Sequence, residues 1–350
     1  MPPVLLDVCC GCGGLSLGMR HIFKDAVHYV GVDVWAEAAR LYAERFGEAY
    51  AADVADTQSV LDAAVGGRRV FAVVGGPPCQ PFSRANVRGK GVEDPRASLV
   101  FSILDLVRRL IEQGNAPSLV LFEQAPTLAS TFRGVLSRVG AQLESAGYDT
   151  QACVVNMCVY GVPQRRRRTI IIGLRRSDLL PRPPASRFAD PSAALATPAA
   201  VPGAMWDETI TPDQAAERKL LISDTHWKRI LEYERASNCH RPRDVRADEP
   251  CRTVTVSNIM STTNDCLRVV MPGGHHRRKL TFEEVEAIMT LPRGWTLFRS
   301  AHTSNRTRVK FIGNAVPPRL FGALFTPEMR AWLLDALRAT PPAPGSHLAV

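Results

Sequence analysis

Short apolar runs alternate, over the first 175 residues, with stretches in which apolar residues recur every three or four positions. A run of four to eight apolar residues is typical of a buried strand, and the second spacing is typical of an amphipathic helix. The pattern predicts strands at Val4–Val8, Val27–Val32, Ala49–Val54, Val70–Val74, Leu119–Phe122, Gln151–Val155 and Thr169–Leu174. It predicts helices at Gly14–Phe23, Ala36–Phe46 and Leu99–Ile111. We therefore expect an α/β fold with a doubly wound, mostly parallel sheet covered on both faces.

The regular alternation stops near residue 175. Pro181–Pro202 is rich in Pro, Ala and Ser, which is typical of a linker or surface loop, and Met205–Val270 is irregular, polar and basic. Helical spacing returns at Thr281, and a last helix is expected over Pro327–Leu337. We expect a main domain over residues 1–174, a smaller irregular domain over 175–308, a return to the main domain over 309–338 and a tail over 339–350.

The charge distribution bears on the partner. The formal net charge is +9, which favours a polyanionic partner without requiring one. The stretch Arg165–Arg187 holds eight arginines and a single acid, Asp178. This stretch is either a solvated basic face or a groove that faces phosphate groups.

Cysteine spacing and hydropathy exclude several classes of protein. Nine cysteines at irregular spacing do not make a disulfide framework, so we expect a reducing cytoplasm. Cys9 and Cys12 have the spacing of half a zinc site, but no matching second pair exists, and we expect no bound metal. No apolar run is long enough to span a bilayer, and the residues after Met1 lack the pattern of a signal peptide.

The first candidate site is the segment Asp7-Val8-Cys9-Cys10-Gly11-Cys12-Gly13-Gly14, which closes one expected strand and opens a helix. Glycines allow a sharp turn and a close approach to a ligand, and a helix start supplies free N–H groups. Ser16 stands where a dinucleotide fingerprint needs its third glycine, which argues against NAD. Asp33 and Asp53 end the next two expected strands. Either acid alone suits a cap or turn, but together with the glycine turn they predict a nucleoside site at the carboxyl ends of the strands.

The second candidate site is Gly75-Gly76-Pro77-Pro78-Cys79-Gln80-Pro81-Phe82-Ser83, directly after an expected strand. Two glycines and three prolines fix an unusual backbone around one thiol. A buried packing cysteine needs no such scaffold, so Cys79 is interpreted as a nucleophile.

With these residues in place, the chain resembles the DNA cytosine-5 methyltransferases, specifically the stand-alone bacterial or phage type. The Pro78-Cys79-Gln80 segment resembles the loop that carries the family's attacking thiolate. Further similar segments follow in the family's order: Asp7–Gly18, Asp33, Asp53, Glu123 after its strand, Gln164-Arg165-Arg166-Arg167-Arg168, and Gly313-Asn314-Ala315-Val316-Pro317-Pro318. Only about Arg175–Cys251 stays unmatched, where the family keeps its variable target-recognition region.

The resemblance implies a sheet of the S-adenosylmethionine-dependent methyltransferase type, S-adenosylmethionine as cofactor and double-stranded DNA as partner. It assigns catalysis to Cys79, Glu123, Arg166 and Arg168. It assigns cofactor binding to Asp7, Cys9, Gly11, Gly13, Gly14, Leu15, Asp33, Trp35, Asp53, Val54, Pro77, Asn314 and Val316. For DNA binding we expect Gln80, Ser83, Arg88, Lys90, Gln164, Arg241, Arg243, Thr253 and Asn258.

Two departures from the family pattern stand out. Cys9 replaces a phenylalanine that packs on the cofactor in the family, so the thiol or Trp35 must cover the adenine. Gln124-Ala125 follows Glu123 where the family has Asn-Val, which affects loop packing and leaves the glutamate in place.

Two other functions stay open from the sequence. One is an RNA methyltransferase on the same scaffold, as in the transfer-RNA-modifying branch of the family. The other is a catalytically silent DNA-binding regulator, which the joint presence of Cys79, Glu123 and Arg166 disfavours. We expect a monomeric modification enzyme, and the sequence leaves open whether a restriction endonuclease is its partner.

Overall fold

A computed structural model of the chain describes residues 1–82, 94–177, 182–190, 207–236, 244–259 and 264–339. The chain divides into two compact units. The first comprises Met1–Asn156, Arg167–Asp190 and Leu320–Val350, and the second comprises Met157–Arg166 and Pro191–Arg319. The ten residues from Met157 to Arg166 thus go with the second unit, whereas strand spacing alone places them in the main domain.

A seven-stranded sheet forms the core of the first unit, in the order β3-β2-β1-β4-β5-β8-β6. Its strands are β1 (Val4–Val8), β2 (His28–Asp33), β3 (Glu48–Ala51), β4 (Val70–Gly75), β5 (Leu119–Gln124), β6 (Tyr148–Asn156) and β8 (Arg167–Arg175). The first five strands of that order are parallel, while β8 runs antiparallel to both of its neighbours. Every expected strand is present, and the mostly parallel sheet is confirmed. Strand order reverses between β1 and β4, which is where sheets of this kind bind ligands at their carboxyl edge.

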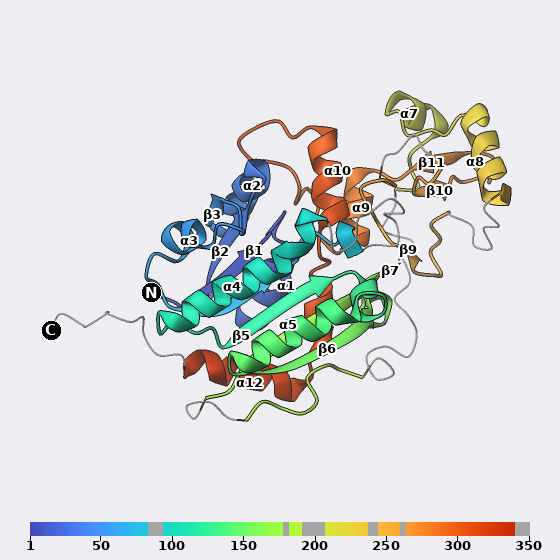
Figure 1. Cartoon of the computed structure of the whole chain (residues 1–350). Coiled ribbons are helices and arrows are strands. Elements are labelled where there is room, and N and C mark those ends of the chain that lie inside the picture. The colour runs from blue at the N-terminus through green and yellow to red at the C-terminus, as the bar shows by residue number, and fades with distance from the viewer. Residues whose placement is uncertain (83–93, 178–181, 191–206, 237–243, 260–263, 340–350) are drawn as a thin grey trace. The chain divides into compact units, whose positions relative to one another are not determined.

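Helices of the first unit follow from apolar spacing. They are α1 (Gly14–Phe23), α2 (Ala36–Phe46), α3 (Thr57–Val60), α4 (Leu99–Glu112), α5 (Arg133–Ser145), α11 (Arg319–Leu324), which starts at the junction with the second unit, and α12 (Pro327–Arg338). In α4, Val100, Ile103, Val107 and Leu110 are buried at helical spacing. The sequence pattern missed α5, because its buried apolar residues stand singly, one per turn, between polar ones. Figure 1 shows α4 and α5 crossing the sheet, and α4 packs between α3 and α5.

The second unit is less regular. It contains β7 (Gln164–Arg165) paired with β9 (Cys251–Arg252), and a hairpin of β10 (Arg268–Val270) and β11 (Arg277–Lys279). Its helices are α7 (Pro212–Glu217), α8 (Asp224–Ala236), α9 (Phe282–Ile288) and α10 (Asn305–Asn314). Sequence spacing missed α8, where only His226 and Ile230 are buried. A buried arginine, Arg268, joins the hairpin to α8 through Glu234 at 2.7 Å.

Among the described residues, no helix is long and apolar enough to cross a membrane. The same residues hold no group of three or more His, Cys, Asp or Glu side chains placed to bind a metal ion. The eight cysteines that the structure describes are free thiols.

Candidate active site

The glycine-rich loop after β1 makes the tight turn that its sequence predicts. Gly11 and Gly13 have left-handed φ angles of 53° and 79°. A Cβ atom at Gly13 would lie 2.5 Å from the ring of Phe46 in α2, so only glycine fits beneath that helix. Cys9 also adopts a left-handed φ of 57°. The loop therefore has a fixed shape at the carboxyl end of β1.

Asp33 is joined directly to this loop. Its carboxylate accepts one hydrogen bond from the Gly11 N–H and another from the Trp35 N–H, each 2.9 Å long. Burial raises the pKa of Asp33 above its usual value. Each carboxylate oxygen keeps a further lone pair. The acid is thus placed to accept a bond from a ligand hydroxyl beside the glycine turn.

Asp7 lies beneath the loop and is 1% exposed. The Ser16 hydroxyl donates to its carboxylate at 2.6 Å, and the Tyr42 hydroxyl lies 2.7 Å from the same Ser16 oxygen. Burial is the main reason that the pKa of Asp7 is raised to about 8. These contacts indicate that Asp7 supports the loop from inside the core, in place of the direct cofactor contact expected from the sequence.

The acid expected at the end of the third strand is displaced. β3 ends at Ala51, so Asp53 lies in the following turn, exposed, where its carboxylate accepts the N–H of Ala55 at 2.9 Å. The neighbouring Val54 is buried. The early end of β3 corrects the expected strand Ala49–Val54. Asp53 makes the turn contact that the sequence offered as its alternative, and its expected contact with the cofactor stays a prediction.

Sequence reasoning missed Val34. Its side chain is 73% exposed directly after Asp33, whereas the aromatic candidate Trp35 is half-buried. An exposed branched side chain beside a buried acid is a signal for apolar contact with a ligand. The exposure makes Val34 a candidate beside Trp35, and the sequence alone could not supply it.

The loop that carries Cys79 extends from the end of β4. A Cβ atom at Gly75 would lie 2.7 Å from the Val8 carbonyl, so β4 packs on β1 without room for a side chain there. Cys79 is half-buried, and its carbonyl accepts the Phe82 N–H at 3.1 Å. The side chain of Gln124 donates to the buried Pro77 carbonyl at 2.7 Å. This bond fastens the Cys79 loop to the end of β5.

Glu123 stands at that same end of β5 and is 4% exposed. The parallel register pairs Gly75 with Phe122, so Glu123 and the Cys79 loop leave the sheet at the same edge. Arg168 approaches from β8, with its Nε 2.9 Å from Glu123 Oε1 and its side chain 12% exposed. The first unit thus brings the thiol loop, a carboxyl group and a guanidinium group to one edge of the sheet.

Two other members of the arginine motif turn into the protein. Gln164 is fully buried; its amide accepts the Val254 N–H at 3.2 Å and donates to Met289 Sδ at 3.1 Å. Arg166 is 3% exposed and donates to the carbonyls of Val254 and Ala315, each at 3.2 Å. Both side chains therefore hold backbone of the second unit in this structure, and the contacts expected from them with DNA and the base stay predictions.

Residues expected to read DNA have similar internal roles. Asn258 is 1% exposed and bonds to Thr253 and Thr255 of its own turn. The Thr253 hydroxyl donates to the Arg165 carbonyl at 2.9 Å. The exposed part of this turn is instead Val256 and Ser257. Gln80, at the start of a 3₁₀ turn (Gln80–Phe82) after Cys79, is half-buried.

The remaining candidates are placed as follows. Gly14 and Leu15 are buried in the first turn of α1. In the second unit, Asn314 is exposed at the end of α10, and Val316 is buried two residues later. The expected DNA contacts at Ser83, Arg88, Lys90, Arg241 and Arg243 lie outside the described residues.

The arginine-rich stretch is not one phosphate-facing surface. Arg165 pairs with Glu249 at 2.9 Å, Arg187 pairs with Asp149 at 2.5 Å, and Arg176 donates to the Tyr148 carbonyl at 2.8 Å. With Arg166 and Arg168, five of the eight arginines are therefore engaged within the protein. Arg167 and Arg182 are exposed.

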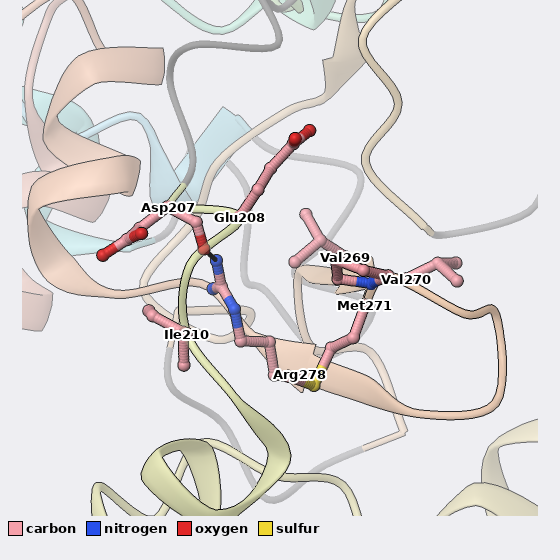
Figure 2. A pocket seen from close by; sticks show the side chains of 8 residues that line it. Asp207, Glu208, Ile210, Val269, Val270, Met271 and Arg278 are labelled. Atoms are coloured by element: carbon pink, nitrogen blue, oxygen red, sulfur yellow. Dashed lines mark hydrogen bonds between the residues drawn. The ribbon is translucent and has the colours of Figure 1, made fainter.

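A separate cavity of about 260 Å³ lies in the second unit (Figure 2). It is lined by Asp207, Glu208, Ile210, Val269, Val270, Met271, Pro272 and Arg278. Arg278 is engaged by Glu284 at 2.7 Å and by the Asp207 carbonyl at 3.0 Å. No residue expected to take part in catalysis lines this cavity, so it does not compete with the edge that carries Cys79.

Comparison with known proteins decides the family. The sequence model of the C-5 cytosine-specific DNA methylases matches residues 4–327. The chain belongs to this family. It is 31% identical over 323 residues to the type II methyltransferase M.AplI of Arthrospira platensis, covering 92% of this chain and 84% of that protein. It is 29% identical to the type II methyltransferase M.PspPI of a Psychrobacter species, covering 90% of this chain and 76% of that protein. The chain is therefore a DNA cytosine-5 methyltransferase, and its family implies the use of S-adenosylmethionine and a DNA substrate.

Solved structures agree on the fold. The Entamoeba histolytica methyltransferase EhMeth has a TM-score of 0.67 at 16% identity, covering 96% of this chain and 99% of that one. The Dnmt2 methyltransferase of S. pombe has the same TM-score at 14% identity and the same coverage. At this level of identity the likeness concerns the fold, which is that of the S-adenosylmethionine-dependent methyltransferases.

Proposed function

We propose that this methyltransferase acts on a cytosine flipped out of a specific double-stranded DNA sequence, through a covalent bond between Cys79 and carbon 6 of the base. Carbon 5 of cytosine is a poor nucleophile, and thiolate addition at carbon 6 makes it enamine-like. A stacked base cannot be reached by such a thiolate, so it must leave the helix at a cost of a few kcal/mol.

The residues around the glycine turn fit S-adenosylmethionine. Gly11 has a left-handed φ and no atom within 4 Å of where its Cβ would stand, which leaves space for a ligand against the backbone. We assign the ribose hydroxyls to Asp33 and the adenine to Val34 and Trp35, with Cys9, Gly13, Gly14, Leu15, Val54, Pro77, Asn314 and Val316 as further cofactor-binding residues. The cofactor supplies the methyl group as a sulfonium.

Three side chains carry the chemistry on the base. Cys79 attacks carbon 6, and Glu123 holds a proton at N3 of the ring, which withdraws electrons and eases the addition. Arg168 fixes the Glu123 carboxyl group and faces the base carbonyl. Once carbon 5 carries the methyl group, a base such as water takes the carbon 5 proton and the double bond between carbons 5 and 6 re-forms. Cys79 then leaves carbon 6 as a thiolate, and the N3 proton returns to Glu123.

The observation that carries this proposal is the 2.7 Å bond from Gln124 to Pro77, because it fastens the thiol loop beside Glu123 and Arg168. Bisulfite sequencing of plasmid DNA from cells that express the chain tests it. We expect protected cytosines at one recurring sequence. Plasmids without any protected cytosine would contradict the proposal, provided that the protein is present and folded.

Sequence choice is assigned to residues between Arg175 and Val270, and a restriction endonuclease with the same target is proposed as partner of a monomeric enzyme. The first assignment is supported by the irregular, polar and basic character of this segment, which lies outside the segments that resemble the family's shared motifs. Exchange of residues 175–270 for those of a relative tests it. The methylated sequence should follow the exchanged segment.

A further inference from the structure

One residue of the second unit, Val254, has both backbone polar groups held by buried side chains. Gln164 accepts its N–H at 3.2 Å, and Arg166 donates to its carbonyl at 3.2 Å. Gln164 and Arg166 are 0% and 3% exposed. Hydrogen bonds to such desolvated groups are costly to lose, so the position of Val254 is closely fixed.

The same guanidinium group reaches a second turn. Arg166 Nη2 donates to the Ala315 carbonyl at 3.2 Å. A Cβ atom on Gly313 would lie 2.4 Å from the Val256 nitrogen, so the backbones of the two turns are in direct contact. The planar guanidinium group of Arg166 therefore bridges the turns that contain Val254 and Ala315, whose backbones pack on each other without side chains between them.

Both turns present side chains outward while Arg166 holds them from within. Val256 is 39% exposed, and the hydroxyls of Thr255 and Ser257 lie 3.0 Å apart on the same turn. On the other turn, Asn314 is exposed directly before Ala315. Each turn thus offers polar or apolar groups to a ligand from a backbone that the other turn supports.

We propose that Arg166 is a positioning residue that couples cofactor binding at the Asn314–Val316 turn to DNA binding at the Thr253–Asn258 turn. This inference rests on the proposed function, since it takes S-adenosylmethionine and DNA as the two ligands. The guanidinium fork satisfies both carbonyls only when both turns are in place. A ligand that orders one turn therefore lowers the cost of ordering the other, and the effect is reciprocal.

The test is the affinity of the enzyme for a short unmethylated duplex that contains the target sequence found by bisulfite sequencing. It is measured with and without saturating S-adenosylhomocysteine. The ratio of the two dissociation constants is the coupling factor. We expect about fivefold or more for the wild type. Arg166→Met removes both donors at similar volume and should bring the factor close to one. Arg166→Lys has a single ammonium group that cannot donate to both carbonyls in the geometry of a guanidinium group, so its coupling factor should lie between those of the wild type and Arg166→Met.

Two further variants separate coupling from general damage. Arg167→Met removes the neighbouring exposed charge and should weaken DNA binding with the coupling factor intact. Gln164→Leu loosens Val254 but leaves the Arg166 bridge, so it should lower the affinity for DNA and keep most of the coupling.

A folded Arg166→Met protein with wild-type coupling would overturn the inference, as would a wild type that binds both ligands with a coupling factor of one. A wild type that binds neither ligand contradicts the proposed function instead.

Discussion

The side-chain amide of Gln124 donates a 2.7 Å hydrogen bond to the carbonyl oxygen of Pro77, two residues before the nucleophile. Gln124 is fully buried, and its own Oε1 accepts the Ala125 N–H at 3.3 Å. The family resemblance places an asparagine at this position, which left the packing of the loop uncertain from sequence. The longer glutamine makes the connection between β5 and the Cys79 loop.

Loss of this bond should slow catalysis as well as lower stability. Gln124→Met keeps the volume but leaves the Pro77 carbonyl without its donor, which costs about 1–3 kcal/mol. We expect kcat for methyl transfer to fall at least about tenfold, because the position of the Cys79 sulfur is no longer fixed. Gln113→Met, the same change at an exposed glutamine, is the control and should match the wild type. Equal rates in both variants would show that the bond does not position the nucleophile.

Cofactor affinity should depend on Asp33. Its carboxylate holds the N–H groups of Gly11 and Trp35, so Asp33→Ala removes both the ribose acceptor and the anchor of the glycine turn. A charged hydrogen bond is worth about 1.5–3 kcal/mol, which corresponds to a rise of roughly 10- to 100-fold in the dissociation constant of S-adenosylmethionine. Calorimetry measures this directly. Asp62→Ala, at an exposed acid, should bind as the wild type does, and unchanged affinity in folded Asp33→Ala would remove Asp33 from the cofactor site.

Asp7 should make stability depend on pH. Burial raises its pKa from 3.8 to about 8, so the folded state holds a proton that the unfolded state releases at lower pH. For a raised pKa, the stabilisation is complete below pH 3.8 and is lost as the pH rises through 8. The free energy of unfolding should thus be about 1 kcal/mol or more lower near pH 9 than near pH 6.

Asp7→Asn supplies the control for this prediction. An amide cannot ionise but can still accept the Ser16 hydroxyl, so this contribution to the pH slope should disappear. Urea unfolding of both proteins at the two pH values provides the comparison. Parallel slopes would mean that Asp7 is ionised in the folded protein.

The salt dependence of DNA binding should come from the exposed arginines. Arg167→Gln should reduce the slope of log affinity against log salt by about one, since one phosphate contact is lost. Arg187→Gln should leave the slope unchanged, because Arg187 is buried against Asp149, and should instead lower the melting temperature. If both variants change the slope equally, the division of the stretch into internal and exposed arginines is wrong.

The seven-stranded sheet is the part of the structure that the sequence predicts best. Short runs rich in apolar residues predicted all seven of its strands. The signal is strongest for β1, β4 and β5, which are buried along their whole length and therefore read as nearly continuous apolar runs. The edge strands β3 and β6 are only partly buried, and the bounds predicted for β3 were wrong.

The sequence does not predict the roles of the glutamines and arginines equally well, because these residue types occur both as buried groups that bind the backbone and as ligand contacts. Gln164 and Gln80 both lie in segments that resemble family motifs. Burial separates the two, because Gln164 is fully buried and clamps the backbone, whereas Gln80 is half-buried and stays a candidate contact. Val34 was not a candidate from the sequence, because one apolar residue gives no sign that its side chain will be exposed in the fold.

Covalent trapping should identify Cys79 as the nucleophile. Carbon 5 gains its reactivity when a thiolate adds to carbon 6, and the adduct normally breaks down once the proton on carbon 5 has left. Fluorine at carbon 5 cannot leave as a cation, so the adduct should persist. Duplex DNA with 5-fluorocytosine at the target, mixed with enzyme and S-adenosylmethionine, should give a complex that survives denaturing electrophoresis.

Two substitutions make this experiment specific. Cys79→Ala should give no trapped complex but should still bind DNA, because binding depends on other residues. Cys79→Ser should also fail, since a hydroxyl lacks the low pKa and the intrinsic nucleophilicity of a thiol. Cys153→Ala, at a half-buried thiol whose pKa burial raises to about 12, should be trapped as efficiently as the wild type. An enzyme that methylates cytosine yet is never trapped, or a Cys79→Ala variant with full activity, would require a mechanism without a thiol adduct.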